Sequence, residues 1–82
     1  MDTSEESPDF LGLYERYFPL VWRWAARFGV PHHSLDDVVQ EVFLTLYKRL
    51  DDFEGRSSLR SWIFAVTYRV VSNFRRRRGR RP

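Results

Sequence analysis

The chain has 82 residues, a net charge of +3 and no cysteine, so one small domain with a single core is expected, without disulfides or cysteine-ligated metals. No apolar run approaches the roughly 18 residues that span a bilayer, and the acidic start differs from a signal peptide, which predicts a cytoplasmic location. Up to Glu54, five basic against eleven acidic residues give a net charge of −6, whereas the remaining 28 residues carry nine arginines and no acid. Aromatic residues are interleaved among these arginines, a pattern typical of surfaces that bind polyanions.

The first helix is predicted over residues 10–28, where apolar residues recur every three or four positions. Residues 1–9 before it are polar and acidic, and we expect them to form a disordered tail. Pro19 lies inside the helix, and because proline removes a backbone donor, a kink or a break is expected there. Gly29 and Pro31 are predicted to end the helix.

A second helix is predicted to begin at Ser34, which forms the pattern of a capping box with Asp37. One face is a predicted core stripe, made of Leu35, Val38, Val39, Val42, Leu46 and Leu50. The opposite face places a leucine and a tyrosine among polar groups: Asp37, Gln40, Glu41, Leu44, Tyr47 and Lys48. This face resembles a protein interface, although scattered exposed apolar residues without a function explain it equally well.

Residues 51–58 are predicted to form a loop in which Ser57 or Ser58 caps a third helix. The core stripe of that helix is predicted to be Leu59, Ile63, Val66, Val70 and Phe74. A neighbouring face combines aromatic, cationic and amide groups: Trp62, Ala65, Arg69, Asn73 and Arg76. A third flank of Phe64, Tyr68 and Val71 is expected to pack against the first helix, and residues 75–82 are expected to fray. The fold class is therefore all-α, a bundle of three helices, or of four if the first breaks at Pro19.

No enzyme chemistry is indicated by these residues. His32 and His33 are the only histidines, and with Asp36 or Asp37 they could form a weak metal site. Ordinary loop histidines are the favoured interpretation, because a metal site needs three or four converging ligands. The four glycines are isolated, so there is no glycine-rich phosphate loop. We therefore expect no catalytic residue, no metal and no cofactor.

Nucleic-acid binding is the stronger signal, and it comes from the loop and the third helix. Trp62 is the best candidate for stacking on a base, which is worth about 1–3 kcal/mol for any base; its alternative is a place at the edge of the core. Groups rich in hydrogen-bond donors surround Gly55: Arg56, Ser57, Ser58 and Arg60. They could hold a base or a phosphate, or form a plain capped turn. The terminal arginines alone are weak evidence, because basic tails also bind membranes and acidic proteins.

The chain closely resembles region 2 of extracytoplasmic-function (ECF) sigma factors over Asp36-Asp-Val-Val-Gln-Glu-Val-Phe43 and over Leu50-Asp-Asp-Phe-Glu-Gly-Arg-Ser-Ser-Leu-Arg-Ser-Trp-Ile63, which leads to the arginine cluster. Tyr14-Glu-Arg-Tyr-Phe-Pro19 is similar to the first helix of that family, so the resemblance covers about residues 10–78. The ordered succession of these pieces makes the resemblance specific. It implies a bacterial transcription initiation domain with the helical fold of sigma region 2.

The resemblance also implies a partner for each face. The second helix is expected to dock on the beta-prime clamp helices of the RNA polymerase core through Asp37, Gln40, Glu41, Leu44 and Tyr47. The loop and the third helix are expected to melt the promoter minus-ten element and hold the non-template strand through Phe53, Arg56, Ser57, Ser58, Arg60, Trp62, Arg69, Asn73 and Arg76. Unstacking costs on the order of a few kcal/mol per base step, which a pocket for the freed base offsets. An anti-sigma factor is a further expected partner, and a membrane is not.

Some positions depart from the family pattern. Tyr68-Arg69 replaces the Arg-Asn of many members, so base preference does not carry over, and Trp62-Ile63 replaces the two aromatic residues of housekeeping sigma factors, which allows a lower melting power. Residues 79–82 are expected to begin a linker, and the family's helix-turn-helix domain, which reads the minus-thirty-five element, is expected to be absent from this chain. We infer a truncated domain, with a naturally short protein left open. Two other functions also stay open: a protein-interaction module that binds an anti-sigma factor, and a nonspecific basic DNA binder.

Overall fold

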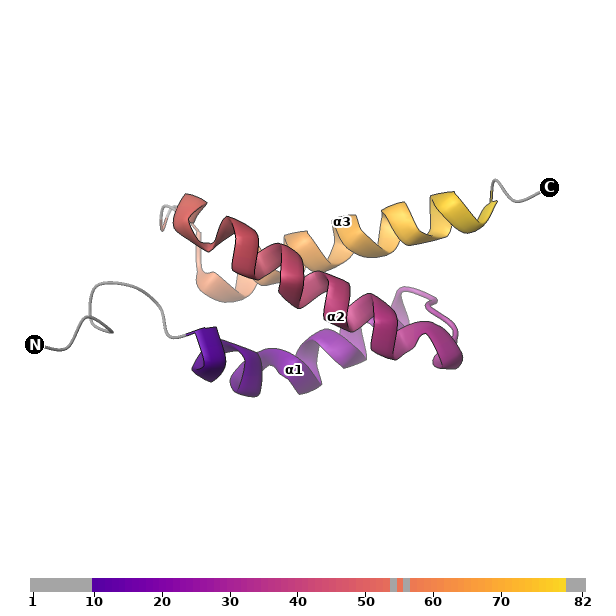
Figure 1. Ribbon diagram of the computed structural model, residues 1–82, viewed down its shortest axis with the longest axis horizontal. Helices are drawn as coiled ribbons and strands as arrows, with labels where there is room; N and C mark the ends of the chain where they lie inside the picture. The colour runs from indigo at the N-terminus through magenta and orange to yellow at the C-terminus, as the bar shows by residue number, and fades with distance from the viewer. Residues whose placement is uncertain (1–9, 54, 56, 80–82) are drawn as a thin grey trace, which may run out of the picture.

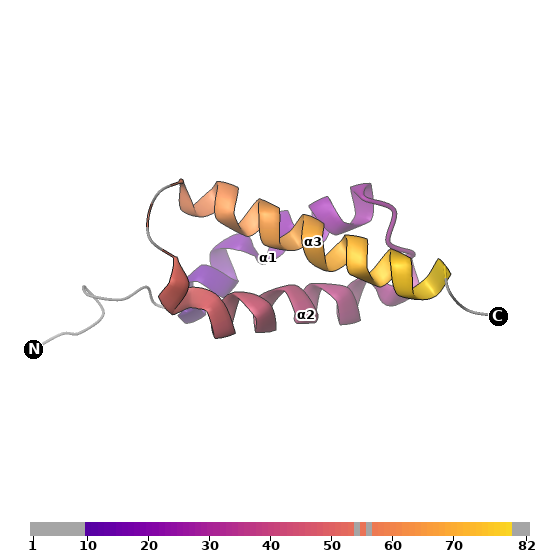
Figure 2. The same ribbon diagram turned by 90° about the horizontal axis from the view of Figure 1, so that it is seen from above.

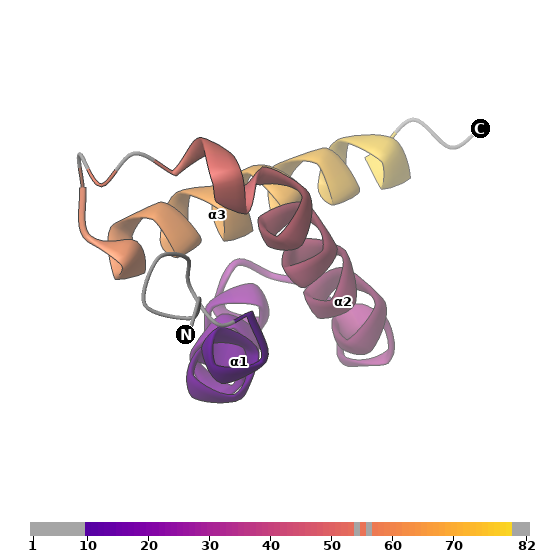
Figure 3. The same ribbon diagram turned by 60° about the vertical axis from the view of Figure 1, so that its left-hand side comes forward.

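The computed structural model describes residues 10–53, 55 and 57–79. In this part of the chain three α-helices and one short 3-10 helix follow one another: α1 (Phe10–Arg27), α2 (His32–Arg49), η2 (Leu50–Asp52) and α3 (Leu59–Gly79). Each α-helix runs opposite to the one before it (Figure 1 and Figure 2). Figure 3 shows α3 lying across one side of the pair formed by α1 and α2. The predicted all-α fold with three helices is confirmed, and the described residues include no strand.

The first helix does not break at its proline. α1 is a single helix of 18 residues with Pro19 exposed in its interior, so the expected break is wrong. Aromatic contacts hold the helix on both sides of this position. The ring of Tyr14 lies 4.7 Å from that of Phe43 in α2, and the ring of Trp24 lies 4.9 Å from that of Phe64 in α3. Packing against both neighbours thus outweighs the hydrogen bond that proline cannot donate.

The predicted stop at Gly29 is confirmed, and it is a Schellman motif. The amide of Gly29 donates to the carbonyl of Ala26 and the amide of Val30 donates to the carbonyl of Ala25, each at 3.1 Å. Gly29 has a φ of +98°, a conformation that strains any residue with a Cβ atom. Val30 and Ala25 are both buried, which supplies the apolar contact of this motif.

The second helix begins two residues before the predicted start. Pro31 is its N-cap, with φ −61° and ψ 148°, and no side chain caps it. The amide of Ser34 donates to the carbonyl of Pro31 at 2.9 Å, so Ser34 already belongs to the first turn and the predicted capping box with Asp37 is wrong. The ring of Pro31 fixes φ near the helical value, which favours helix entry at this point. His32 and His33 are consequently helical residues rather than loop residues.

The core forms where the three α-helices meet. The predicted stripe of α2 is buried except for the half-buried Leu50. Phe43, which lies outside that stripe, is nevertheless 2% exposed because it packs against Tyr14 and Phe18 of α1. In α3 the predicted stripe is buried or half-buried, and two further residues are buried with it: Thr67 and Val71.

Ser58 caps the third helix, as predicted. Its hydroxyl accepts a hydrogen bond of 3.0 Å from the amide of Ser61. α3 then continues to Gly79, so the expected fraying of residues 75–79 is wrong. The expected linker after residue 79 lies outside the described residues, and so does the expected tail over residues 1–9.

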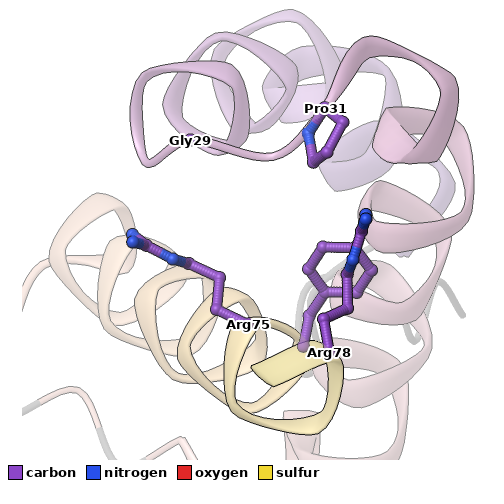
Figure 4. Close-up of a pocket in the computed structure, with 5 residues that line it drawn as sticks. Gly29, Pro31, Arg75 and Arg78 are labelled. Carbon is purple, nitrogen blue, oxygen red and sulfur yellow. The ribbon is translucent and has the colours of Figure 1, made fainter. Parts of the chain in front are cut away.

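Three of the terminal arginines make contacts that fit the helical state of this end, two of them with other parts of the domain and one within α3. Arg75 Nη1 donates to the carbonyl of Phe28 at 2.9 Å, Arg77 Nη2 lies 3.6 Å from Glu41 Oε1, and the Arg78 guanidinium carbon lies 5.6 Å from the ring centroid of Phe74. Figure 4 shows Arg75 reaching toward the loop at Gly29 and Arg78 reaching toward Pro31. A run of like charges is thereby held in a regular helix.

Candidate protein-binding and nucleic-acid-binding surfaces

The outward face of α2 gathers all five residues predicted to bind a protein. Asp37 and Gln40 are exposed and Glu41 is partly exposed. The two apolar members are the most unusual, because Leu44 is 53% and Tyr47 is 62% exposed. An exposed leucine and tyrosine surrounded by polar groups match the centre and rim of a protein interface.

The first turns of α1 extend this surface, which the sequence alone did not predict. The ring of Phe10 meets that of Tyr47 edge-on at 5.2 Å, and Gln40 Nε2 donates to the hydroxyl of Tyr14 at 3.3 Å. A hollow of about 200 Å³ lies between the two helices, lined by Phe10, Tyr14, Gln40, Phe43, Leu44 and Tyr47. A helical wheel of one helix cannot show which neighbouring helix lies beside it. The repeated aromatic residues of α1 were nevertheless a signal that this helix takes part in a surface.

Glu41 connects this surface to the basic helix through its ion pair with Arg77. The two side chains are 43% and 57% exposed, and exposed pairs contribute about 0–1 kcal/mol. The pair therefore adds little stability. Its effect is to reduce the negative charge on the α2 face and the positive charge at the end of α3.

At the start of α3, Trp62 is both a core residue and a surface residue. It is half-buried against the core, and its ring lies 5.0 Å from that of Phe53 at an interplanar angle of 34°. Ser57 and Ser58 precede it, but the Ser58 hydroxyl is engaged as the helix cap. Arg56, also predicted to bind DNA, lies outside the described residues. The structure thus brings together Phe53, Trp62 and the two serines.

A groove between α2 and α3 continues from Trp62. It has a volume of about 220 Å³ and is lined by Thr45, Arg49, Trp62, Ala65, Val66, Arg69 and Val70. Arg49 was not among the predicted site residues, yet it shares the groove with Trp62 and Arg69. The available signal was its position three residues after the core residue Leu46, which places it at the margin of the core stripe. Two guanidinium groups on opposite helices can neutralise a phosphate backbone that runs along this groove.

The outer face of α3 holds the remaining predicted DNA-binding residues except one. A shallow hollow there is lined by Phe64, Ala65, Tyr68, Arg69, Ser72, Asn73 and Arg76. Arg60 is separate, because two positions along a helix turn a side chain through about 200°. Its guanidinium carbon lies 5.8 Å from the ring centroid of Trp24 in α1. Arg60, predicted to bind DNA with the donor groups around Gly55, thus lies beside α1 and apart from the face that carries Trp62 and Arg69.

The predicted contact of the third flank with α1 is confirmed. The ring of Phe28 meets the rings of Phe64 and Tyr68 edge-on at 5.6 and 5.4 Å. Val71 of the same flank is buried. Tyr68 is 57% exposed, so this flank is aromatic and accessible as well as packed.

The surfaces on α2 and α3 differ in the sign of their charge. α3 contains six arginines and no acidic residue. The outward face of α2 contains Asp37 and Glu41, and Asp36 is close by in the sequence. Guanidinium groups beside exposed rings can bind phosphates and stack on bases, and this combination binds single-stranded nucleic acid.

In the described parts of the chain no three histidine, cysteine, aspartate or glutamate side chains converge closely enough to bind a metal ion. Among the same residues, no helix combines the length and the apolar character needed to cross a membrane.

Comparison with known proteins gives consistent matches. Residues 13–81 match the family described as sigma-70 region 2. The chain is 36% identical over 70 residues to the ECF RNA polymerase sigma-E factors of Escherichia coli strain K12 and of Salmonella typhimurium strain LT2, with 85% of this chain and 36% of each relative covered. It is 33% identical over 64 residues to the RNA polymerase sigma factor NccH of Alcaligenes xylosoxydans xylosoxydans, with 78% of this chain and 34% of that protein covered. The chain thus spans little more than a third of the length of these relatives.

Proposed function

Because the chain belongs to the sigma-70 region 2 family, we propose that it acts in bacterial transcription initiation, binding the RNA polymerase core through α2 and opened promoter DNA through α3. The proposed role is binding, without catalysis. One observation carries it: the acidic, partly apolar face of α2 is separate from α3, which has six arginines and no acid. Two partners of different chemistry can therefore bind the domain at the same time.

The polymerase partner is proposed to be the clamp helices of the beta-prime subunit. Leu44 and Tyr47 provide exposed apolar area at the centre of the α2 face, and Asp37, Gln40 and Glu41 provide the polar rim. Exposed aromatic and aliphatic anchors within a polar rim are the usual source of binding energy in protein interfaces. An anti-sigma factor that covers the same residues would compete with polymerase.

The DNA partner is proposed to be the non-template strand of the minus-ten element. Arg49 and Arg69 border the groove beside Trp62, and Asn73 and Arg76 continue the surface along α3. Phosphate contacts would position the strand, and an unstacked base would be captured near Trp62. Capture of a base stabilises the melted state of the promoter, because it offsets the unstacking cost.

Selection from a pool of single-stranded oligonucleotides with a randomised window tests this function. We expect the chain to enrich one motif, and we expect Trp62→Ala to lose that enrichment while total bound DNA falls much less. Trp62→Phe keeps a ring and is the matched control that should retain most of the enrichment. Equal recovery of all sequences would instead identify a nonspecific basic binder, and binding to an anti-sigma factor without any DNA binding would identify a protein-interaction module.

A further inference from the structure

A cleft on the opposite flank of α3 from Trp62 has the features of a second nucleotide site. It lies between the end of α1 and the start of α3, has a volume of about 290 Å³, and is lined by Trp24, Arg60, Ser61 and Phe64. We propose that this cleft holds an unstacked base of single-stranded DNA. The inference rests on the proposed function, because it assumes that α3 binds an opened strand, and it adds a site on the α1 side of that helix.

Two aromatic rings form the walls of the cleft. The rings of Trp24 and Phe64 lie 4.9 Å apart at an angle of 86°, so they meet as a corner. Phe64 is 41% exposed, whereas Trp24 is half-buried and packed against the core. A planar base that stacks on one ring meets the edge of the other. Because the core holds Trp24 in place, binding costs little loss of side-chain freedom.

Polar groups lie at the rim, where the edge of a base and its phosphate would be. The guanidinium carbon of Arg60 lies 5.8 Å from the ring centroid of Trp24, so this cation already stacks on one wall. Arginine has five donors and can bind a base carbonyl or a phosphate oxygen. The hydroxyl of Ser61 accepts a hydrogen bond of 2.9 Å from Ser58 and is exposed, which leaves its own proton for a ligand.

The charge around the cleft selects an anionic partner. Between Glu15 and Asp36 all the charged residues are arginines, and α3 has no acidic residue. The charged residues of the two helices that form the cleft are therefore all basic, counting α1 from Arg16 onward and all of α3, while the walls of the cleft are aromatic. A ligand that is both anionic and aromatic fits these two properties. Single-stranded DNA has both, whereas duplex DNA keeps its bases stacked in the helix interior and offers the rings nothing to bind.

The flank continues in a direction that a strand could follow. Next along α3, Tyr68 is 57% exposed, and its ring lies 5.4 Å from that of Phe28, which directly follows α1. The hollow beside Tyr68 is also lined by Asn73 and Arg76, which belong to the proposed DNA surface. Bases in the cleft and at Tyr68 would thus lie on one continuous path with the phosphate contacts of α3.

Two oligonucleotides of about 12 residues test the proposal, namely oligothymidine and an abasic strand of equal length. Both carry the same phosphates, so the ratio of their dissociation constants reports the contribution of the bases. With the 82-residue chain we expect oligothymidine to bind about five-fold tighter or more. In NMR spectra, oligothymidine should shift the indole resonance of Trp24, and the abasic strand should leave it nearly unchanged.

Variants then locate the bases. Phe64→Leu keeps an apolar side chain but removes one wall, and Arg60→Gln removes the cation. Each should lower the ratio of the abasic to the oligothymidine dissociation constant by about five-fold. Phe18→Leu makes the same exchange on an α1 ring that does not line the cleft and should keep the ratio. Circular dichroism checks that each variant is folded. If a variant unfolds, the shift of the Trp24 resonance in the unmodified chain still shows whether a base enters the cleft.

The possible failures can be told apart. If Trp62 shifts with oligothymidine while Trp24 does not, and Phe64→Leu keeps the ratio, the cleft is not a base site but the proposed function stands. If both strands bind equally and neither indole moves, the cleft and the single-strand part of the proposed function fail together. If polyglutamate shifts Trp24 and oligothymidine does not, the cleft binds an acidic protein instead.

Discussion

Arg75 donates a hydrogen bond of 2.9 Å to the backbone carbonyl of Phe28, which ties the basic end of α3 to the residue that directly follows α1. The carbonyls at the end of a helix have no partner within the helix, and the negative end of the helix dipole favours a cation. One arginine of the terminal run thus completes the end of a helix that lies 47 positions earlier in the sequence.

Replacing this arginine should lower stability although its side chain is on the surface. We expect Arg75→Ala to reduce the free energy of unfolding by about 1 kcal/mol, because it leaves the Phe28 carbonyl without its charged donor. Urea denaturation measures the change. Arg76→Ala, one residue further on the outer hollow of α3, should change stability by less than about 0.5 kcal/mol. Equal losses in the two variants would show that the hydrogen bond contributes nothing specific.

Gly29 should be the least replaceable of the described glycines. Its φ is +98°, and an added Cβ atom would lie 3.6 Å from Arg75 Nη1. We expect Gly29→Ala to destabilise the domain by about 1–2 kcal/mol, mainly through backbone strain. Gly79→Ala is the matched control: an added Cβ meets nothing within 4 Å, so it should leave the thermal midpoint unchanged or slightly raised. A Gly29→Ala variant as stable as the control would contradict the assigned backbone conformation.

The double substitution of Gln40 and Tyr47 by alanine tests the polymerase surface. Tyr47 is 62% exposed, so we expect helicity to persist while pull-down of the beta-prime clamp helices is lost. Some loss of stability is expected as well, because Tyr47 contacts Phe10 and Gln40 bonds to Tyr14. Lys48→Ala, on the same exposed side of α2, should retain binding. Capture of the clamp helices by the double variant would exclude this face as the contact.

Salt dependence distinguishes arginines that meet phosphates from those that hold the fold. For single-stranded DNA, each phosphate neutralised contributes about 0.7 to the slope of log affinity against log salt concentration. Arg69→Gln and Arg76→Gln should each reduce the slope by about that amount. Arg77→Gln should reduce it less, because Arg77 is paired with Glu41. Identical slopes for all three variants would indicate diffuse attraction to the whole helix.

The helices and most of the core could be predicted because they depend on the periodicity of a single segment. The buried stripe of α2 and the Ser58 cap of α3 are of this kind. Phe43 was missed because its burial depends on the rings of α1, and a wheel for α2 contains no such information. The helical state of the terminal arginines was missed for a related reason: Phe28 and Glu41, which hold Arg75 and Arg77, are distant in the sequence.

The site residues show the same limit. The outward face of α2 was predictable from one helix, and its five members lie together. The contact of Arg60 with Trp24 of α1 was not predicted, because a pattern within one segment does not show which neighbouring helix a side chain meets. Arg49 and Phe10 join the surfaces only through packing between helices, which pattern analysis of one segment cannot give.

Pro19 interrupts the backbone hydrogen bonds of α1 without breaking the helix. With no amide at this position, the carbonyl of Glu15 lacks its helical partner, so the two halves of α1 are less tightly coupled than in an unbroken ladder. The first half packs on α2 through Tyr14, and the second half packs on α3 through Trp24. We therefore expect the amides of the two halves to exchange hydrogen with solvent at different rates. A partner on α2 would slow the opening of the first half, and a partner on α3 would slow that of the second.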